Sequence, residues 1–232
     1  MFPEPAARDK LAFVSERAES LVMSDVDPRL VAALRQQLAR RPADAARVGW
    51  KHGGGDDERI GGEIAVGHLT SSTTLENGRA YVGGGEDLHA DVEVAVEIGA
   101  AGEISNYGVA LEFCDLADGG TPEEVVAKND YHRAVAFGPF VEALPAQLEA
   151  VLVINGERRC AAPAPIPTEI ADRVAAVNRV LEAVGESLRP GDRVITGLIV
   201  NGPVSPGDEV VAELGPIGCV RLHVGSGSEI ST

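Results

Sequence analysis

The chain has 232 residues, 44% of them hydrophobic but only 4% aromatic, so small aliphatic side chains must build most of its core. Lys and Arg number 20 against 36 Asp and Glu, which gives a formal net charge of −16 at pH 7. This acidic balance argues against nucleic acids and anionic membranes as partners. The 27 glycines and 14 prolines predict many turns, which suits a β-rich body.

The three cysteines, Cys114, Cys160 and Cys219, are widely spaced and form no Cys-x-x-Cys pair. They predict neither a disulfide framework nor a zinc cluster, and they favour a reducing cytoplasm. The N-terminal residues MFPEPAARDK lack the basic start and apolar run of a secretory signal. No segment approaches the ~18 consecutive apolar residues of a membrane span. We therefore expect a cytoplasmic protein.

Two helices are predicted at the start of the chain. Apolar residues recur at helical spacing over 6–24, and a second helix is expected over 27–40, with Asp27 as its N-cap. These helices predict a helical N-terminal lobe over 1–50, followed by a β-rich domain over 51–232.

The middle of the chain changes to the two-residue period of β-strands. The clearest case starts at Leu88, where valines alternate with acidic residues and alanine. Asn155-Gly156 is a typical hairpin turn. The expected elements are loops and short strands over 53–87, strands from 88, over 109–113 and over 133–137, the last stopped by Gly138-Pro139, and a hairpin over 148–160.

A single later helix is expected over 167–187, where Ile170 and Val177 belong to an apolar face. The remaining C-terminal sequence alternates strands with turns, two of which are Pro-Gly-Asp at 190–192 and 206–208. Together the elements predict an α+β fold with a mostly antiparallel, rolled β-sheet or barrel and a small helical N-terminal lobe.

Asp91 and Glu93 lie two residues apart on the strand from Leu88, so both carboxylates project from the same face. Like charges at that spacing repel unless a positive charge lies between them, and Mg²⁺ prefers oxygen ligands of this kind. Glu112 sits in an apolar strand, where burial of a carboxylate without a partner is costly. These three acids are candidate metal ligands, and the alternative for the first two is a solvated strand face.

Several motifs resemble the fumarylacetoacetate hydrolase superfamily, in particular its 2-keto-4-pentenoate hydratase branch. The similarity covers roughly residues 47–224, and its most specific part is the C-terminal portion. The matching segments are Gly49-Trp50-Lys51, Asp91-Val92-Glu93, Ala110-Leu111-Glu112, the run from Leu188 to Gly197, Pro206-Gly207-Asp208 and Gly215-Pro216-Ile217-Gly218.

The sequence also departs from that branch. Asp91 replaces the usual Glu, and the stretch before Glu112 is short, which leaves Asp115 as an alternative third ligand. Lys128 stands where the hydratases carry Asp, in Val126-Ala127-Lys128-Asn129. Lys128 and Asp130 ahead of Gly138-Pro139 resemble the Lys-x-x-Asp segment of the hydrolase branch instead. The chain mixes features of two branches, so the reaction type stays open.

The resemblance implies a small 2-oxo acid substrate chelated to Mg²⁺ or Mn²⁺, with the metal acting as a Lewis acid. The first reading is a hydratase or related lyase that acts on a 2-hydroxydienoate. The alternatives are a C–C bond hydrolase of the acylpyruvase type, a decarboxylase, and a non-catalytic binding relative. The family also implies a homo-oligomer, a dimer or larger.

Three residues are candidates for catalysis. Lys51 ends the one basic stretch of an acidic chain, so it is the first candidate for a cation that faces the substrate. Lys128 is the second. Glu76 follows a segment where the hydratases carry a substrate-lining loop, and it is a candidate acid or base.

Four further residues are candidates for substrate binding. Leu75 belongs to the expected substrate-lining loop, and Asn129 to the segment that resembles Val-Ala-Asp-Asn. Thr196 and Gly197 end a predicted strand, where a hydroxyl and a backbone N–H are expected to hold a substrate carboxylate. An ordinary strand end with a glycine turn is the alternative for this pair.

Overall fold

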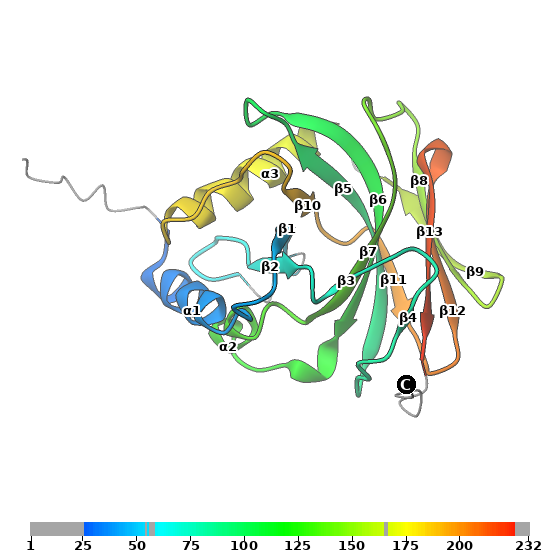
Figure 1. Cartoon of the computed structure of the whole chain (residues 1–232), viewed down its shortest axis with the longest axis horizontal. Helices are drawn as coiled ribbons and strands as arrows, with labels where there is room; N and C mark the ends of the chain where they lie inside the picture. Colours follow the sequence, from blue (N-terminus) through cyan, green and yellow to red (C-terminus); the bar gives the residue numbers. More distant parts are fainter. Residues whose placement is uncertain (1–25, 54, 56–58, 165–166, 226–232) are drawn as a thin grey trace, which may run out of the picture.

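The computed structural model describes residues 26–53, 55, 59–164 and 167–225. Figure 1 shows a curled sheet at the centre, with the helices on one side and a second, smaller sheet on the other. None of the helices in the described part of the chain is both long and apolar enough to cross a membrane. The helix expected over 6–24 lies outside the described residues.

The helices are α1 (Pro28–Ala39), α2 (Pro122–Ala127) and α3 (Pro167–Glu182). The strands before α2 are β1 (Arg47–His52), β2 (Val66–Thr70), β3 (Thr74–Leu75), β4 (Ala80–Tyr81), β5 (Leu88–Ile98) and β6 (Ile104–Asp115). Those after α2 are β7 (His132–Val141), β8 (Glu149–Ile154), β9 (Glu157–Pro163), β10 (Arg193–Ile195), β11 (Val200–Pro203), β12 (Glu209–Leu214) and β13 (Gly218–Val224).

The large sheet has the strand order β2-β1-β10-β5-β6-β7-β3, and β11 pairs with β5 beside β10. The small sheet has the order β4-β13-β12-β8-β9. Most neighbours are antiparallel, and the parallel pairs are β1–β10, β3–β7 and β4–β13. The expectation of an α+β fold with a mostly antiparallel, curled sheet is confirmed.

The core lies between the two sheets. Val92, Val94 and Val96 of β5 are fully buried there, and β12 and β13 pack against β5, β6 and β7. The opposite face of β5 and β6, which carries the predicted acids, therefore points away from the small sheet. A second, smaller cluster around Ala95, Ala110 and Val135 packs on that face.

Two predicted boundaries are wrong. β7 continues through Gly138-Pro139 to Val141, because Phe137 pairs with Ala110 and Phe140 with Gly108, which leaves two residues opposite one. Such a bulge has an unpaired position, so a proline there breaks no ladder hydrogen bond. Helix α3 ends at Glu182 rather than 187, because Gly185 adopts φ +81° and terminates the helix.

The expected helix over 27–40 is confirmed as α1, whose N-cap Asp27 accepts a hydrogen bond from the Arg29 backbone N–H. The expected hairpin is also confirmed, as β8 and β9 joined by Asn155 and Gly156 with positive φ. The predicted division at residue 50 stays a prediction. Strand β1 extends across it and pairs with β10 and β2, so it belongs to the large sheet.

Candidate active site

A cavity of about 250 Å³ opens on the acidic face of β5 and β6. Asp91, Glu93 and Glu112, the three predicted metal ligands, all line it, and so does Lys51 from β1. Each of these side chains is at least nine-tenths buried. The structure thus brings the predicted acids and the first candidate cation into one enclosed space.

The strand register explains why the acids meet. Asp91 of β5 pairs directly with Glu112 of β6, and Glu93 pairs with Ala110. Directly opposed residues of antiparallel strands project on the same side with neighbouring Cβ atoms. Since residues two apart also share a face, all three carboxyl groups converge from one sheet surface.

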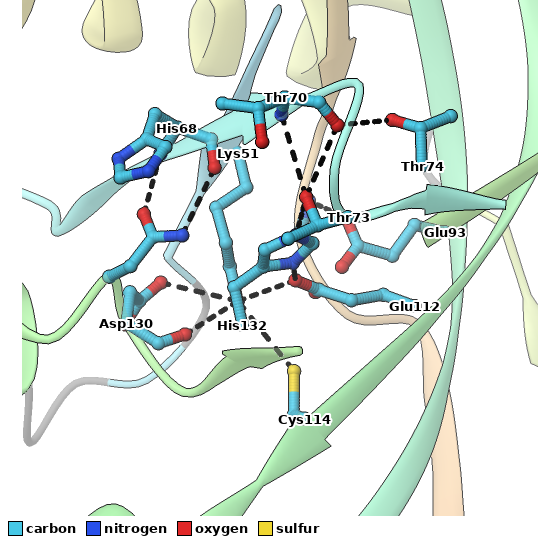
Figure 2. A network of polar contacts seen from close by, with 12 residues as sticks. Lys51, His68, Thr70, Thr73, Thr74, Glu93, Glu112, Cys114, Asp130 and His132 are labelled. Carbon is cyan, nitrogen blue, oxygen red and sulfur yellow. Dashed lines mark hydrogen bonds and ion pairs between the residues drawn. The ribbon is translucent and has the colours of Figure 1, made fainter. Parts of the chain in front are cut away.

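Lys51 reaches into the middle of this acidic cluster (Figure 2). Its Nζ lies 3.0 Å from Glu112 Oε1 and 3.4 Å from Asp130 Oδ2. It donates a hydrogen bond of 2.8 Å to the backbone oxygen of Asp130, and it lies 3.7 Å from Cys114 Sγ. The ammonium group is therefore held in one position by strands β1 and β6 and by the segment before β7.

His132 supports Glu112 from the other side. Its Nδ1 lies 2.7 Å from Glu112 Oε1, and its Nε2 lies 2.9 Å from Thr73 Oγ1. The imidazole is buried, so it fixes the orientation of the Glu112 carboxyl group through a hydrogen bond that water does not weaken. Glu112 Oε1 thus takes both contacts, while Oε2 has no hydrogen-bond partner in the described structure.

The acids differ in their readiness to ionise. Burial raises the pKa of Asp91 to about 7, with the Glu112 carboxylate adding to the shift and Lys51 opposing it. Burial also raises the pKa of Glu93 well above its usual range, and Glu112 adds to that shift too. Both effects follow from placing several carboxyl groups together in a space with little water.

Glu112 behaves in the opposite way. Burial by itself raises its pKa, but the Lys51 ammonium and the His132 hydrogen bond outweigh burial and lower the pKa to about 2. Burial disfavours the charged form of Lys51, yet Cys114, Glu112 and Asp130 hold its pKa well above the usual range. The pair is therefore a carboxylate and an ammonium ion at neutral pH.

Two oxygen atoms of the cluster lack a hydrogen-bond partner. Asp91 Oδ1 and Glu112 Oε2 are both buried and unpaired within the described structure. An unpaired buried carboxylate oxygen is costly, and a hard divalent cation satisfies such atoms without a proton donor. Three carboxyl groups around two unpaired oxygens therefore fit a divalent metal ion, which Asp91, Glu93 and Glu112 would hold.

The segment that carries Asp130 has an unusual backbone. Asn129, Asp130 and Tyr131 are consecutive non-glycine residues with φ of 74°, 54° and 60°. Residues other than glycine seldom adopt this left-handed backbone conformation, and such strained residues are often found at functional sites. Here it turns the chain from α2 into β7 so that Asp130 and Tyr131 line the cavity.

The predicted substrate-binding residues hold the site together in this structure. Asn129 Oδ1 accepts the His68 backbone N–H at 2.7 Å, and its Nδ2 donates to the His68 carbonyl. Thr196 Oγ1 donates to the Val94 carbonyl at 2.9 Å. The Gly197 N–H donates to Glu93 Oε2 at 2.6 Å. These contacts brace the cavity wall, and contact with a substrate stays a prediction for all three.

The remaining candidates lie away from the cavity. Lys128 is exposed beside α2 and donates to the carbonyls of Asp118 and Gly119. Glu76 is 85% exposed at its side chain and lies 3.7 Å from Arg79. Leu75 is half-buried in β3 and packs against the main core.

Asp115, the alternative third ligand, also points elsewhere. It accepts backbone N–H groups of Asp87 and Ala117, and it lies 3.2 Å from an Arg133 nitrogen. It is not among the residues that line the cavity. The parity of β6 explains the difference, because residue 115 projects on the side opposite to 112.

Three residues of the site gave little signal in the sequence. Cys114 lies two positions after Glu112, so strand parity alone would have placed it in the cavity. Asn201 lines the cavity because β11 pairs it with Asp91, a register that no sequence pattern reveals. His132 has no diagnostic spacing, since its role depends on the register between β6 and β7.

A smaller cavity of about 200 Å³ adjoins the first and shares His52 and Leu198 with it. Its lining includes Arg173 of α3, whose Nη1 donates to the Thr196 carbonyl at 2.9 Å. Among the described residues, no carboxylate forms an ion pair with Arg173. His52 Nδ1 is buried there without a hydrogen-bond partner. This smaller cavity, called the annex below, is thus rich in hydrogen-bond donors.

No protein-family model matches the chain, and no curated protein matches its sequence. The fold does match solved structures. The 4-oxalocrotonate decarboxylase from Pseudomonas putida, complexed with calcium and acetate, has a TM-score of 0.70 and 18% identity, covering 84% of this chain and 85% of that chain. The same decarboxylase complexed with magnesium and adipate has a TM-score of 0.71.

Two further structures are similar over most of the chain. Fumarylpyruvate hydrolase from Pseudomonas aeruginosa, in complex with Mn²⁺ and pyruvate, has a TM-score of 0.54 and 18% identity, covering 79% and 90% of the two chains. A protein from Yersinia pestis assigned to the fumarylacetoacetate hydrolase family has a TM-score of 0.54 and 21% identity, covering 78% and 94%. The fumarylacetoacetate hydrolase fold expected from the sequence is confirmed.

The raised pKa of Asp91 makes metal affinity depend on pH. Below a pKa of about 7 the metal-free Asp91 is protonated, and a cation must displace that proton to bind. We therefore expect the apparent affinity for Mg²⁺ or Mn²⁺ to fall about tenfold from about pH 8 to about pH 6. Isothermal titration calorimetry at several pH values checks this, and an affinity that stays constant across the range contradicts the Asp91 assignment.

Proposed function

We propose that this chain is a metal-dependent enzyme of the fumarylacetoacetate hydrolase superfamily that acts on a small 2-oxo acid as a lyase of the hydratase type. The observation that carries the proposal is the buried cluster of Asp91, Glu93 and Glu112 beside Lys51, with two carboxylate oxygens unpaired. A cluster of this kind destabilises the fold unless it serves a ligand.

A divalent cation bound by these carboxylates would supply Lewis acidity to the carboxylate and 2-oxo group of the substrate. The protein supplies the proton transfer. Lys51 Nζ lies on the cavity wall between Glu112 and Asp130, and it carries a proton at neutral pH. We assign Lys51 the role of donating a proton to the substrate carbon chain and of taking one back.

The surroundings of Lys51 suit this role. Glu112 and the Asp130 carbonyl hold the amine in a fixed position, so little orientation is lost when a substrate arrives. Burial keeps bulk water from competing for the proton. In a hydratase reaction the water that is consumed must enter through the cavity mouth, where Leu198 and Leu116 are partly exposed.

A decarboxylase is the second candidate, and a specific observation favours it. The donor-rich annex beside the cavity, with Arg173 and His52, suits a second carboxylate at the far end of a substrate. The similar 4-oxalocrotonate decarboxylase was solved with adipate, a dicarboxylate.

The choice of metal, the assembly and the compartment remain proposals. Mg²⁺ and Mn²⁺ are the cations that we expect, in line with those bound by the similar enzymes. We propose a homo-oligomer because the family resemblance implies one, and a cytoplasmic location because the cysteine pattern of the sequence favours it. A non-catalytic binding protein stays the alternative from another functional class.

Substrate assays test the proposed activity. Purified protein with Mg²⁺ is expected to hydrate 2-hydroxypenta-2,4-dienoate, or to release CO₂ from 4-oxalocrotonate, and to leave acylpyruvates intact. A chelator is expected to abolish the activity. Turnover of acylpyruvates alone would replace the lyase by a hydrolase. A protein that binds metal and turns over none of these substrates would favour the non-catalytic alternative.

The Arg173→Gln variant distinguishes the hydratase hypothesis from the decarboxylase hypothesis within the same assay. A substrate with a distal carboxylate uses the annex, so its KM is expected to rise by about tenfold or more when the guanidinium is removed. The KM for the monocarboxylate dienoate is expected to stay close to wild type. Arg179→Gln is the matched control, because that arginine lies on the same helix and already pairs with Glu63.

Substitution of the two candidate lysines tests the proton donor. Lys51→Met is expected to lower kcat by more than about tenfold, because a positioned acid–base group is lost. Its metal affinity is not expected to weaken, because an ammonium that repels the cation is removed. Lys128→Met serves as the comparison, since Lys128 lies outside the cavity. Normal turnover by Lys51→Met together with loss in Lys128→Met would reverse the assignment.

A further inference from the structure

The proposed metal site contains a potential sulfur ligand as well as carboxylate oxygens. One ligand atom each from Asp91, Glu112 and Cys114 all lie within 4.8 Å of one another. This is the one such group of three found among the residues that the structure describes. Cys114 is 3% exposed and lines the same cavity as the two acids.

The strand geometry keeps Cys114 in this position. Asp91 and Glu112 are paired across β5 and β6, and Cys114 follows Glu112 by two residues on the same face. Glu93 is not a member of this group, and its Oε2 accepts the Gly197 N–H at 2.6 Å. Cys114 Sγ is thus the third potential ligand atom beside one oxygen each of Asp91 and Glu112.

The two unpaired oxygens indicate independently that a cation belongs here. Asp91 Oδ1 and Glu112 Oε2 are buried without hydrogen-bond partners, and both residues line the cavity with Cys114. Since one oxygen of each acid lies within 4.8 Å of Cys114 Sγ, a cation bound by the two carboxylates would lie beside the sulfur. The cysteine is thus part of a group that already requires a positive charge.

The nature of the donor atoms determines which cation fits. Mg²⁺ is bound by oxygen ligands and has little affinity for thiolates. Zn²⁺ and Co²⁺ accept sulfur together with carboxylate oxygens, and a thiol bound to such an ion loses its proton to solvent. A site with two carboxylates and one cysteine therefore differs from an all-carboxylate site in its selectivity.

We propose that Cys114 is a direct metal ligand, together with Asp91 and Glu112, and that its sulfur gives the cavity an affinity for thiophilic divalent cations such as Zn²⁺ or Co²⁺ that an all-carboxylate site would lack. This inference rests on the proposed function, since it takes the same cavity to be the metal centre. Glu93 stays a proposed carboxylate ligand, and Lys51 borders the site without taking part in the thiolate contact.

Titration of the metal-free full-length protein with Co²⁺ tests the proposal. Binding through Cys114 produces a thiolate-to-cobalt charge-transfer absorption in the near ultraviolet. The band is expected in the wild type and in Cys219→Ser, which removes an exposed cysteine, and it is expected to vanish in Cys114→Ser. Cys160 is retained in every variant, so loss of the band in Cys114→Ser alone assigns the band to Cys114.

Affinities measured by competition provide the second readout. Cys114→Ser is expected to weaken Zn²⁺ and Co²⁺ binding by at least about tenfold, while Mg²⁺ binding changes far less. The retained Mg²⁺ affinity also shows that the variant is folded around an intact carboxylate cluster.

The possible failures are distinguishable. Co²⁺ that binds the wild type without the charge-transfer band, or with a band that survives Cys114→Ser, overturns the role of Cys114 and leaves the proposed function standing. A wild type that binds none of Co²⁺, Zn²⁺, Mn²⁺ and Mg²⁺ overturns both the inference and the proposed metal-dependent activity.

Discussion

The burial of several carboxyl groups on one face of the β5–β6 pair is the constraint on which the site depends. Asp91, Glu93, Glu112 and Asp130 share a small cavity, and Lys51 is the one lysine among the described residues that line it. One positive charge neutralises Glu112 but leaves Asp91 and Glu93 with raised pKa values. A divalent cation would neutralise the remaining negative charge of Asp91 and Glu93. The same ion would therefore stabilise the folded site and supply the proposed chemistry.

The opposite face of β5 and β6, which packs into the core, holds this unfavourable cluster of carboxyl groups in place. Val92, Val94 and Leu111 alternate with the acids and are fully buried on the core side of the large sheet. Their burial anchors β5 and β6 and offsets the cost of the charged face. Rigid strands also fix the spacing of the carboxyl groups, whereas the strained segment of Asn129 to Tyr131 supplies a part of the wall that is built from a turn.

Strand parity made part of the site predictable. Asp91 and Glu93 were placed on one face by their spacing alone. Glu112 was singled out as a carboxylate in an apolar strand and Lys51 as the end of the one basic stretch, and the resemblance to a known family added support for these residues. The contribution of Cys114, Asn201 and His132 depends on which strands pair and in what register, a property of the whole sheet rather than of local sequence. Lys128 lies beside a short helix and Glu76 in a surface turn, and both side chains are exposed. In such segments the local sequence pattern does not determine which way a side chain points, so the sequence alone kept both residues as candidates for the cavity.

The most direct test of the account is a crystal grown with Mn²⁺ and oxalate, a mimic of the 2-oxo acid end of the substrate, with the anomalous scattering of manganese recorded. The account predicts one strong peak within coordination distance of carboxylate oxygens on β5 and β6, with oxalate bound to the ion. Clear density for Lys51 and water in the cavity, with no manganese there at saturating concentration, would contradict it.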